Sequence, residues 1–209
     1  MPLLISLIST LIFLSACSTN TKFVAELEQK IQDGDIIFQS THSRQCEAVK
    51  LATHSEYSHV GIIFKDKGEW VVYEAVQPVK KTPLSEWITH GQNNHYVVKR
   101  LKNSSHVLTP TILDEMQQIG EQNLGLDYDI YFNWSDDEIY CSELVWKMYD
   151  EGAGIHIGEL KQLKDFDLTS QSVKTIMSER YGTDIPLEEE VIAPSDLFES
   201  EKLILVDQK

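Results

Sequence analysis

Two short apolar segments rich in β-branched residues constrain the fold of this chain more than any other feature. They cover residues 59–64 and 70–76, and the five residues between them read KDKGE. A charged, glycine-containing turn between two apolar runs is typical of a β-hairpin, whose strands pair antiparallel. The sequence therefore predicts an antiparallel sheet built around this hairpin.

Helical segments flank the hairpin along the chain. Thr109-Pro110 is typical of a helix start, with threonine as the cap and proline at the first helical position, and predicts a helix over 111–124. Thr82-Pro83 repeats the pattern and predicts a short helix through residue 88. This order of elements indicates an α+β domain, an antiparallel sheet with helices packed on one side. The other predicted elements are helices at 43–53, 141–151 and 170–181, strands at 36–38 and 203–206, and a third strand of the meander at 95–101.

The first sixteen residues carry no charge and contain an apolar run of signal-peptide length, residues 3–14. The run ends in Leu14-Ser15-Ala16-Cys17, which resembles a bacterial lipobox and would make Cys17 the site of lipidation. A plain secretory signal or a buried hydrophobic helix is the alternative. We expect a lipoprotein signal peptide over 1–16, a tether with a short helix at 23–31 over 17–32, and one folded domain over 33–209.

The chain is strongly acidic, which limits its partners. Asp and Glu number 33 against 18 Lys and Arg, and the formal net charge is −15. Such a surface repels phosphate backbones, so nucleic acid is not an expected partner. Membrane contact is expected through a lipid on Cys17, and Ser18 after it suggests the periplasmic face of the outer membrane if the cell is Gram-negative.

Three residues suited to nucleophilic catalysis lie in predicted elements. Cys141 begins a predicted helix, where unpaired N–H groups and the helix dipole favour the thiolate, the nucleophilic form of the side chain. His59 begins the first hairpin strand, and hairpin pairing would bring Glu74 near it to fix the histidine tautomer. Singly, each has another explanation: a disulfide between Cys141 and Cys46, a structural histidine, or a solvent-facing glutamate. We expect instead that Cys46 packs as a small hydrophobe and that the three form one site.

Two motifs resemble those of NlpC-type papain-like hydrolases. They are Gly125-Leu126-Asp127-Tyr128 and Cys141-Ser142-Glu143-Leu144-Val145, and the order of histidine before cysteine resembles the circularly permuted branch of that superfamily. The closer similarity is to the YiiX/YebB-like group and runs from residue 34 to about 200. Its blocks are GDIIF (34–38), LATH (51–54), YSH (57–59), YEAV (73–76), PL (83–84), NWSDD (133–137) and YCSE (140–143).

This resemblance implies a permuted papain-like fold and assigns roles to the site. Cys141 would be the nucleophile, His59 the general base and Glu74 the third member. Tyr128 matches the tyrosine whose hydroxyl helps to bind the oxyanion in the unpermuted branch.

Two residues depart from the family pattern near these positions. Asp127 replaces the proline before Tyr128, which could alter the loop that carries this tyrosine. Glu143 replaces the glycine two residues after Cys141, where it could place a carboxylate at the site or cap the helix.

We expect neither a metal nor another cofactor. His54 and His59 share no helical or strand face, and with Cys141 they lack the spacing of a zinc site. The acidic stretch at 127–138 lacks the ligand spacing and glycine of an EF-hand, so a solvated rim is expected there. The sequence contains no P-loop, G-x-S-x-G or dinucleotide-binding glycine pattern.

These residues and the resemblance lead to three hypotheses about function. The leading one is a lipid-anchored cysteine hydrolase of amidase or peptidase type, which cleaves amide bonds in the bacterial cell envelope through an acyl-enzyme. The second keeps the acyl-enzyme but acts on a lipid ester or amide, as a hydrolase or acyltransferase. The third is a non-catalytic envelope-binding lipoprotein. A narrow polar cleft at Cys141 would favour a peptide, and a wide apolar pocket would favour acyl chains.

Overall fold

The computed structural model describes residues 23–209, so the predicted signal peptide and Cys17 lie outside the described residues. The chain divides into two units, with the boundary between residues 31 and 32. In the first unit, residues 23–28 form a helix that ends earlier than predicted, because the chain turns at 29–30. No helix within residues 23–209 combines the length and apolar character needed to cross a bilayer.

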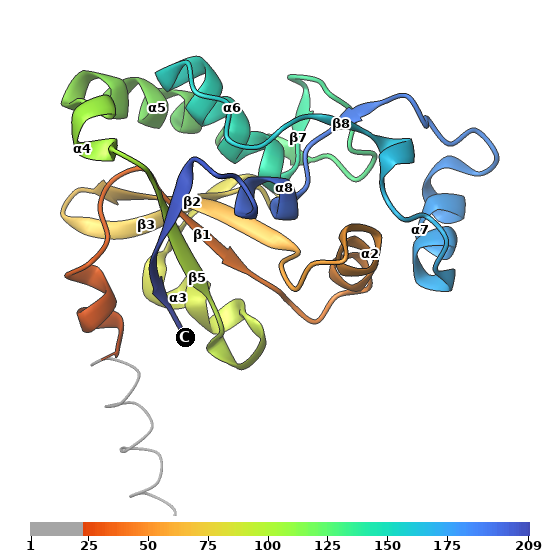
Figure 1. Cartoon of the computed structure of the whole chain (residues 1–209), viewed down its shortest axis with the longest axis horizontal. Helices are drawn as coiled ribbons and strands as arrows, with labels where there is room; N and C mark the ends of the chain where they lie inside the picture. The colour runs from red at the N-terminus through yellow and green to blue at the C-terminus, as the bar shows by residue number, and fades with distance from the viewer. Residues whose placement is uncertain (1–22) are drawn as a thin grey trace, which may run out of the picture. The chain divides into compact units, whose positions relative to one another are not determined.

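A six-stranded antiparallel sheet forms the centre of the unit 32–209 (Figure 1). The predicted hairpin is confirmed as β2 (His59–Asp66) and β3 (Glu69–Glu74). On one side of it lies β1 (Asp35–Gln39), followed by β5 (Val97–Leu101) and the edge strand β10 (Leu203–Gln208). Since β5 pairs with β1 rather than with the hairpin, its predicted place as the third strand of the meander is wrong.

The position beside β3 belongs to β4 (Lys80–Pro83), which the sequence analysis did not predict as a strand. Its residues are polar and end in proline, and an edge strand tolerates both features. Thr82 therefore lies in β4, and its predicted role as a helix cap is wrong. The following helix, α3 (Leu84–His90), begins after Pro83 without a side-chain cap.

Two helices, α5 (Pro110–Gln122) and α6 (Cys141–Ala153), lie together over the sheet (Figure 1). The cap of α5 is confirmed, since the Thr109 hydroxyl accepts a hydrogen bond from the backbone N–H of Ile112. A Cβ at Gly152 would lie 2.6 Å from Cγ of Met116, so the two helices approach closely only because glycine stands there. The core under them contains sheet residues and α6 residues, among them Phe38, Ile62, Tyr73, Leu144 and Met148.

A further pair of helices packs together at one end of the sheet, α2 (Arg44–Thr53) and α7 (Gln171–Tyr181) (Figure 1). Ala48 of α2 and Val173 and Met177 of α7 bury a small apolar cluster between them. The remaining elements are short: 3-10 turns at Gln92–Asn94 and Leu163–Asp165, α4 (Ser104–Val107), α8 (Pro194–Phe198), a parallel pair of β6 (Asp127–Tyr128) and β7 (Glu138–Ile139), and an antiparallel pair of β8 (Lys161–Gln162) and β9 (Glu190–Val191).

Candidate active site

Cys141 is the first residue of α6, as predicted, and only 4% of it is exposed. Two hydrogen bonds to Ile192 hold the start of this helix in place. The Ser142 hydroxyl donates to the carbonyl of Ile192 at 2.7 Å, and the backbone N–H of Ile192 donates to the Tyr140 hydroxyl at 3.1 Å. The thiol therefore sits at the positive end of a helix dipole, on a backbone that is tied to the segment after β9.

His59 and Glu74 meet because β2 and β3 pair in the predicted way. His59 begins β2 opposite Gln39 of β1, and Glu74 ends β3. Glu74 is 2% exposed, and its Oε2 lies 2.7 Å from Nε2 of His59. Since Nε2 is bound to the carboxylate, Nδ1 is the ring nitrogen left for the Cys141 thiol, which lies close enough to raise the pKa of the imidazole.

Two further donors hold the Glu74 carboxylate in place. The Trp87 indole N–H of α3 donates to Oε2 at 2.9 Å, and the Thr82 hydroxyl of β4 donates to Oε1 at 2.5 Å. The Trp87 ring also stacks on the His59 ring, with centroids 5.8 Å apart. A buried carboxylate with three donors is stable in its ionised form, and it cannot turn away from the imidazole.

The electrostatics of the pair favour a charged imidazole. Burial alone would lower the pKa of His59, but hydrogen bonds and charge from Cys141 and Glu74 outweigh it and raise this pKa to about 10. Burial likewise opposes the ionised form of Glu74, yet His59 and Thr82 hold the pKa of its carboxyl below the usual range. At neutral pH the arrangement therefore favours a charged imidazole beside the ionised carboxylate of Glu74.

Tyr128 lies on β6 and lines a pocket together with Cys141. Its hydroxyl accepts a hydrogen bond from Nε2 of Gln45 at 2.8 Å. The loop before it is held by Gln77, which bonds both the backbone N–H of Tyr128 and the exposed carboxylate of Asp127. The aspartate that departs from the family pattern thus helps to fix the position of Tyr128 from outside the pocket.

Glu143, the second residue that departs from the family pattern, is fully buried and lies two residues after Cys141. Its carboxylate lies 2.9 Å from Nζ of Lys147 and accepts, at 3.4 Å, the backbone N–H of Tyr140 at the start of α6. Burial raises the pKa of this carboxyl to about 7, although Lys147 opposes the rise. Glu143 thus contributes to the cap of α6, the helix that begins at Cys141.

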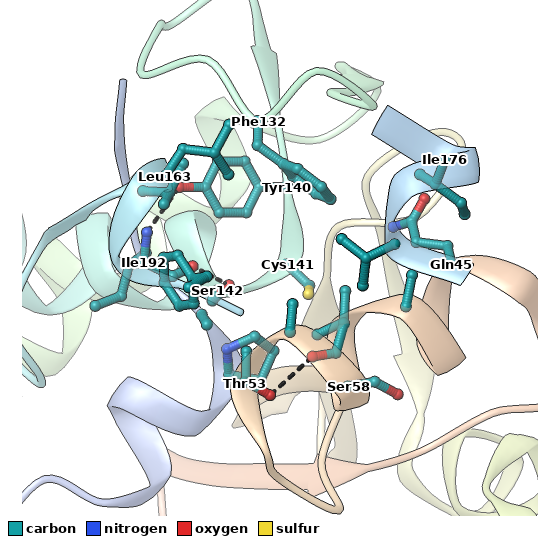
Figure 2. Close-up of a pocket in the computed structure, with 18 of the residues that line it drawn as sticks. Gln45, Thr53, Ser58, Phe132, Tyr140, Cys141, Ser142, Leu163, Ile176 and Ile192 are labelled. Atoms are coloured by element: carbon teal, nitrogen blue, oxygen red, sulfur yellow. Dashed lines mark hydrogen bonds between the residues drawn. The ribbon is translucent and has the colours of Figure 1, made fainter. Parts of the chain in front are cut away.

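The pocket in front of Cys141 encloses about 760 Å³, including its open mouth. Figure 2 shows the Cys141 sulfur between the rings of Phe132 and Tyr140 on one side and Thr53 on the other. Among the residues that line it, Arg180 carries the only formal charge at neutral pH besides any on Cys141. Most of the lining is apolar: Ala48, Val49, Ala52, Leu163, Phe166, Leu168, Val173, Ile176, Met177, Val191, Ile192, Ala193 and Pro194.

Cys46 does not pack as a small hydrophobe, contrary to the prediction. Its sulfur lies 2.9 Å from the Thr41 hydroxyl, and it is half-buried on α2. Burial would raise the pKa of this thiol, but hydrogen bonds with Ser43, Ser58 and Thr41 outweigh it and lower the pKa. Both Cys46 and Cys141 are free thiols, so the alternative of a disulfide between them does not hold here.

The acidic stretch at 127–138 is only partly the solvated rim that was predicted. Asp129 is buried, and its two oxygens accept the backbone N–H groups of Tyr131 and Asn133 at 2.6 Å. Asp136 is exposed and pairs with Lys147 at 2.8 Å. Within residues 23–209, no three His, Cys, Asp or Glu side chains gather in a group that could hold a metal ion.

Sequence reasoning missed four residues around the trio. Thr82 and Trp87 hold Glu74, while Gln45 and Arg180 line the pocket beside Tyr128. No local pattern marks these four as functional, because each reaches the site through strand order or helix packing. A polar residue at the end of the hairpin's neighbouring strand, such as Thr82, could have been suspected only if β4 had been predicted.

Comparisons with known proteins identify the family of this chain. Residues 30–207 match a family described as permuted papain-like amidase enzymes, YaeF/YiiX, C92 family. The chain is 45% identical to the protein YiiX of Escherichia coli (strain K12) over 175 residues, which are 84% of this chain and 85% of that protein. A crystal structure titled metalloprotein yiiX, from Escherichia coli O157:H7, is 44% identical and has a TM-score of 0.82, covering 86% of this chain and 98% of that one. The predicted permuted papain-like fold is thereby confirmed, and the chain belongs to the C92 family of permuted papain-like amidases.

Proposed function

We propose that this amidase-type enzyme works through Cys141, His59 and Glu74 and forms an acyl-enzyme. The observation that carries the proposal is the buried His59 imidazole: it is hydrogen-bonded to a carboxylate that two further donors hold, and it lies close enough to the Cys141 thiol for that thiol to raise its pKa. A protein that only binds a ligand has no physical need for a charged histidine buried between a thiol and a carboxylate.

In the proposed mechanism the Cys141 thiolate adds to the substrate carbonyl carbon, and the electron pair of the C=O bond moves to oxygen. The resulting oxyanion is stabilised by the Tyr128 hydroxyl and by backbone N–H groups at the start of α6, which have no acceptor within the helix. The imidazolium of His59 then gives its proton to the leaving nitrogen as the C–N bond breaks. His59 next accepts a proton from water, which attacks the thioester and releases the acid and the thiol.

The pocket supports a substrate whose acyl part is a hydrocarbon chain. Its lining is apolar on most sides, and only Arg180 offers a formal charge for a polar peptide stem. Covering this surface with an acyl chain would gain about 25 cal/mol for each Å² of apolar surface removed from water. The apolar lining therefore favours a lipid amide over a peptide, with a lipid ester, hydrolysed or transferred, as the second candidate.

A metal has no part in the proposed mechanism. The related Escherichia coli structure is titled a metalloprotein, but the described residues of this chain offer no three-ligand group for a metal ion. The proposed location is the bacterial cell envelope, with the chain anchored by a lipid on Cys17.

Two chromogenic anilides test the proposal: decanoyl p-nitroanilide and N-acetyl-Ala-Ala p-nitroanilide. We expect p-nitroaniline release from the decanoyl compound and a decanoyl adduct on Cys141 by mass spectrometry, both absent in Cys141→Ala. Turnover of the peptide alone would support the same trio with a peptide substrate. Neither turnover nor an adduct with either compound would refute the proposed mechanism.

A further inference from the structure

Three polar side chains form a continuous hydrogen-bonded series in the wall of the pocket. Nη2 of Arg180, on α7, donates to Oε1 of Gln45 at 2.6 Å. Nε2 of Gln45, on α2, donates to the Tyr128 hydroxyl at 2.8 Å. All three residues line the pocket with Cys141, and Figure 2 places Gln45 on the α7 side of it, beside Ile176.

The arginine fixes the direction of every bond in this series. A guanidinium can only donate, so the oxygen of the Gln45 amide must face it. The amide nitrogen then faces Tyr128, and it too can only donate. The Tyr128 oxygen is therefore the acceptor in its bond with Gln45, and its own proton must point to another acceptor.

The setting of Arg180 supports a specific placement rather than a solvated surface charge. Its guanidinium lies over the Phe132 ring, with 5.1 Å between Cζ and the ring centroid. Burial lowers the pKa of Arg180, although negative groups around it, including Asp129 and Glu179, oppose the change. A cation held in an apolar wall polarises the amide and the phenol in series more strongly than it would in water.

The surroundings of Tyr128 keep its phenol in the neutral form, which can donate. Burial and the nearby charge of Cys141 raise the pKa of Tyr128 well above its ordinary value. The bond from Gln45 and the charge of Arg180 act in the opposite direction, which makes the neutral hydroxyl a stronger donor without removing its proton.

We propose that Gln45 and Arg180 are positioning residues that aim the Tyr128 O–H at the oxyanion formed when Cys141 adds to a substrate carbonyl. The proposal rests on the proposed function and deepens it. No proton is transferred along the series: the phenol donates a hydrogen bond to the new negative charge and keeps its proton. Neither residue touches the reacting atoms, so each acts through Tyr128.

The sharpest test reverses one bond of the series while keeping the other. In Gln45→Glu, the carboxylate still accepts from Arg180 but can no longer donate to Tyr128. It accepts the phenol proton instead and draws the O–H away from the oxyanion. If Gln45 only linked α2 to α7, the new ion pair would leave activity unchanged.

The assay measures the rate at which p-nitrophenyl decanoate acylates Cys141. The readout is the p-nitrophenolate released in the first turnover. We expect Tyr128→Phe to slow acylation about 100-fold, the effect of losing one oxyanion donor, and Gln45→Glu to approach that loss. Arg180→Met should slow it less, about 10-fold, since the amide stays but loses its fixed orientation. The double variant with Gln45→Glu and Tyr128→Phe should be no slower than Tyr128→Phe alone, because both changes remove the same bond.

Two controls separate positioning from folding. Alkylation of Cys141 by iodoacetamide forms no oxyanion, so its rate should stay within about twofold of the wild-type rate in each variant. Arg44→Met removes a neighbouring arginine that also joins α2 to α7, through Glu179 at 2.8 Å, but does not line the pocket, and it should acylate normally.

The outcomes distinguish the two proposals. If Gln45→Glu acylates at the wild-type rate, or if its loss adds fully to that of Tyr128→Phe, the positioning role is refuted and the proposed catalytic trio stands. If alkylation falls together with acylation, the variants act on the thiol itself and the positioning role is again refuted. If wild-type Cys141 forms no acyl adduct, the proposed function fails and the positioning role fails with it.

Discussion

Replacing Glu74 by glutamine tests the charge of the third member without disturbing its hydrogen bonds. In one amide orientation the glutamine oxygen takes the place of Oε2 and still accepts from His59 and Trp87. The NH₂ group then faces the Thr82 hydroxyl, which can accept instead of donating. We therefore expect Glu74→Gln to fold normally and to lose only the negative charge beside the imidazole.

The size of the effect follows from the pKa of His59. Its rise from 6.5 to about 10, at 1.36 kcal/mol for each pH unit, corresponds to about 5 kcal/mol of stabilisation of the imidazolium. Cys141 and Glu74 share this stabilisation, so losing the Glu74 charge should remove about 2 kcal/mol of it. Deacylation, the step in which neutral His59 takes a proton from water and becomes charged, should slow about 30-fold. Loss of the base in His59→Ala should be more severe, within the range of about 10² to 10⁴ for general acid–base catalysis.

The pH profile identifies the cause of the loss. In the wild type, kcat/KM for decanoyl p-nitroanilide should fall at high pH with a midpoint near the His59 pKa of about 10. In Glu74→Gln this fall should begin at least one pH unit lower, because the imidazolium gives up its proton more easily. Glu69→Gln, the same change at the exposed start of β3, is the matched control and should leave the profile unchanged. An unaltered profile in Glu74→Gln would show that the carboxylate only orients the ring.

Three other predictions concern the nucleophile, the anchor and a buried acid. Cys141→Ala should abolish acylation while circular dichroism shows an unchanged fold, because a small residue suffices at a helix start. Cys17→Ser should move the protein out of the detergent phase in phase partitioning of cell extracts, and unchanged partitioning would refute lipidation at Cys17. The Glu143 carboxyl has a pKa of about 7 when folded and 4.5 as its ordinary value, so between these pH values it is ionised in the unfolded chain and protonated in the folded one. The free energy of unfolding should therefore fall by about 3 kcal/mol from pH 4.5 to pH 8. Urea titrations should show a smaller fall in Glu143→Gln than in the wild type. An equal fall in the variant would show that other groups cause the pH dependence.

The parts of the fold that could be predicted are those fixed by neighbours in the sequence. The hairpin needs only two apolar runs and a turn, and α5 needs only Thr109-Pro110 before an amphipathic stretch. The pairing of His59 with Glu74 follows from the hairpin as well, since the two residues lie at the same end of adjacent strands. Each of these inferences depends on contacts between residues no more than 15 positions apart.

The parts that could not be predicted depend on packing between distant segments. Lys80 to Pro83 has no apolar alternation, and it becomes a strand only because β3 offers an open edge. Asp129 belongs to a stretch of high charge, yet it is buried because its carboxylate is needed by two backbone N–H groups of its own loop. Gln45 and Arg180 are 135 residues apart and meet only after α2 and α7 have packed.

Cys141, His59 and Glu74 belong to different segments of the chain from most of the pocket wall, and this difference determines which substitutions leave the site in place. Cys141 and His59 meet because α6 lies against β2 and β3, a contact that does not depend on whether the histidine precedes or follows the cysteine along the chain. The pocket wall comes mostly from other segments: α2, α7 and the stretches at 163–168 and 191–194. Side chains in that wall can therefore be exchanged without moving Cys141, His59 or Glu74, except where the wall bonds to the site itself. Gln45 and Tyr128 mark that exception: under the proposed mechanism a change there should slow the acylation of Cys141, whereas a change at Ile176 or Leu168 should alter only the preference among substrates.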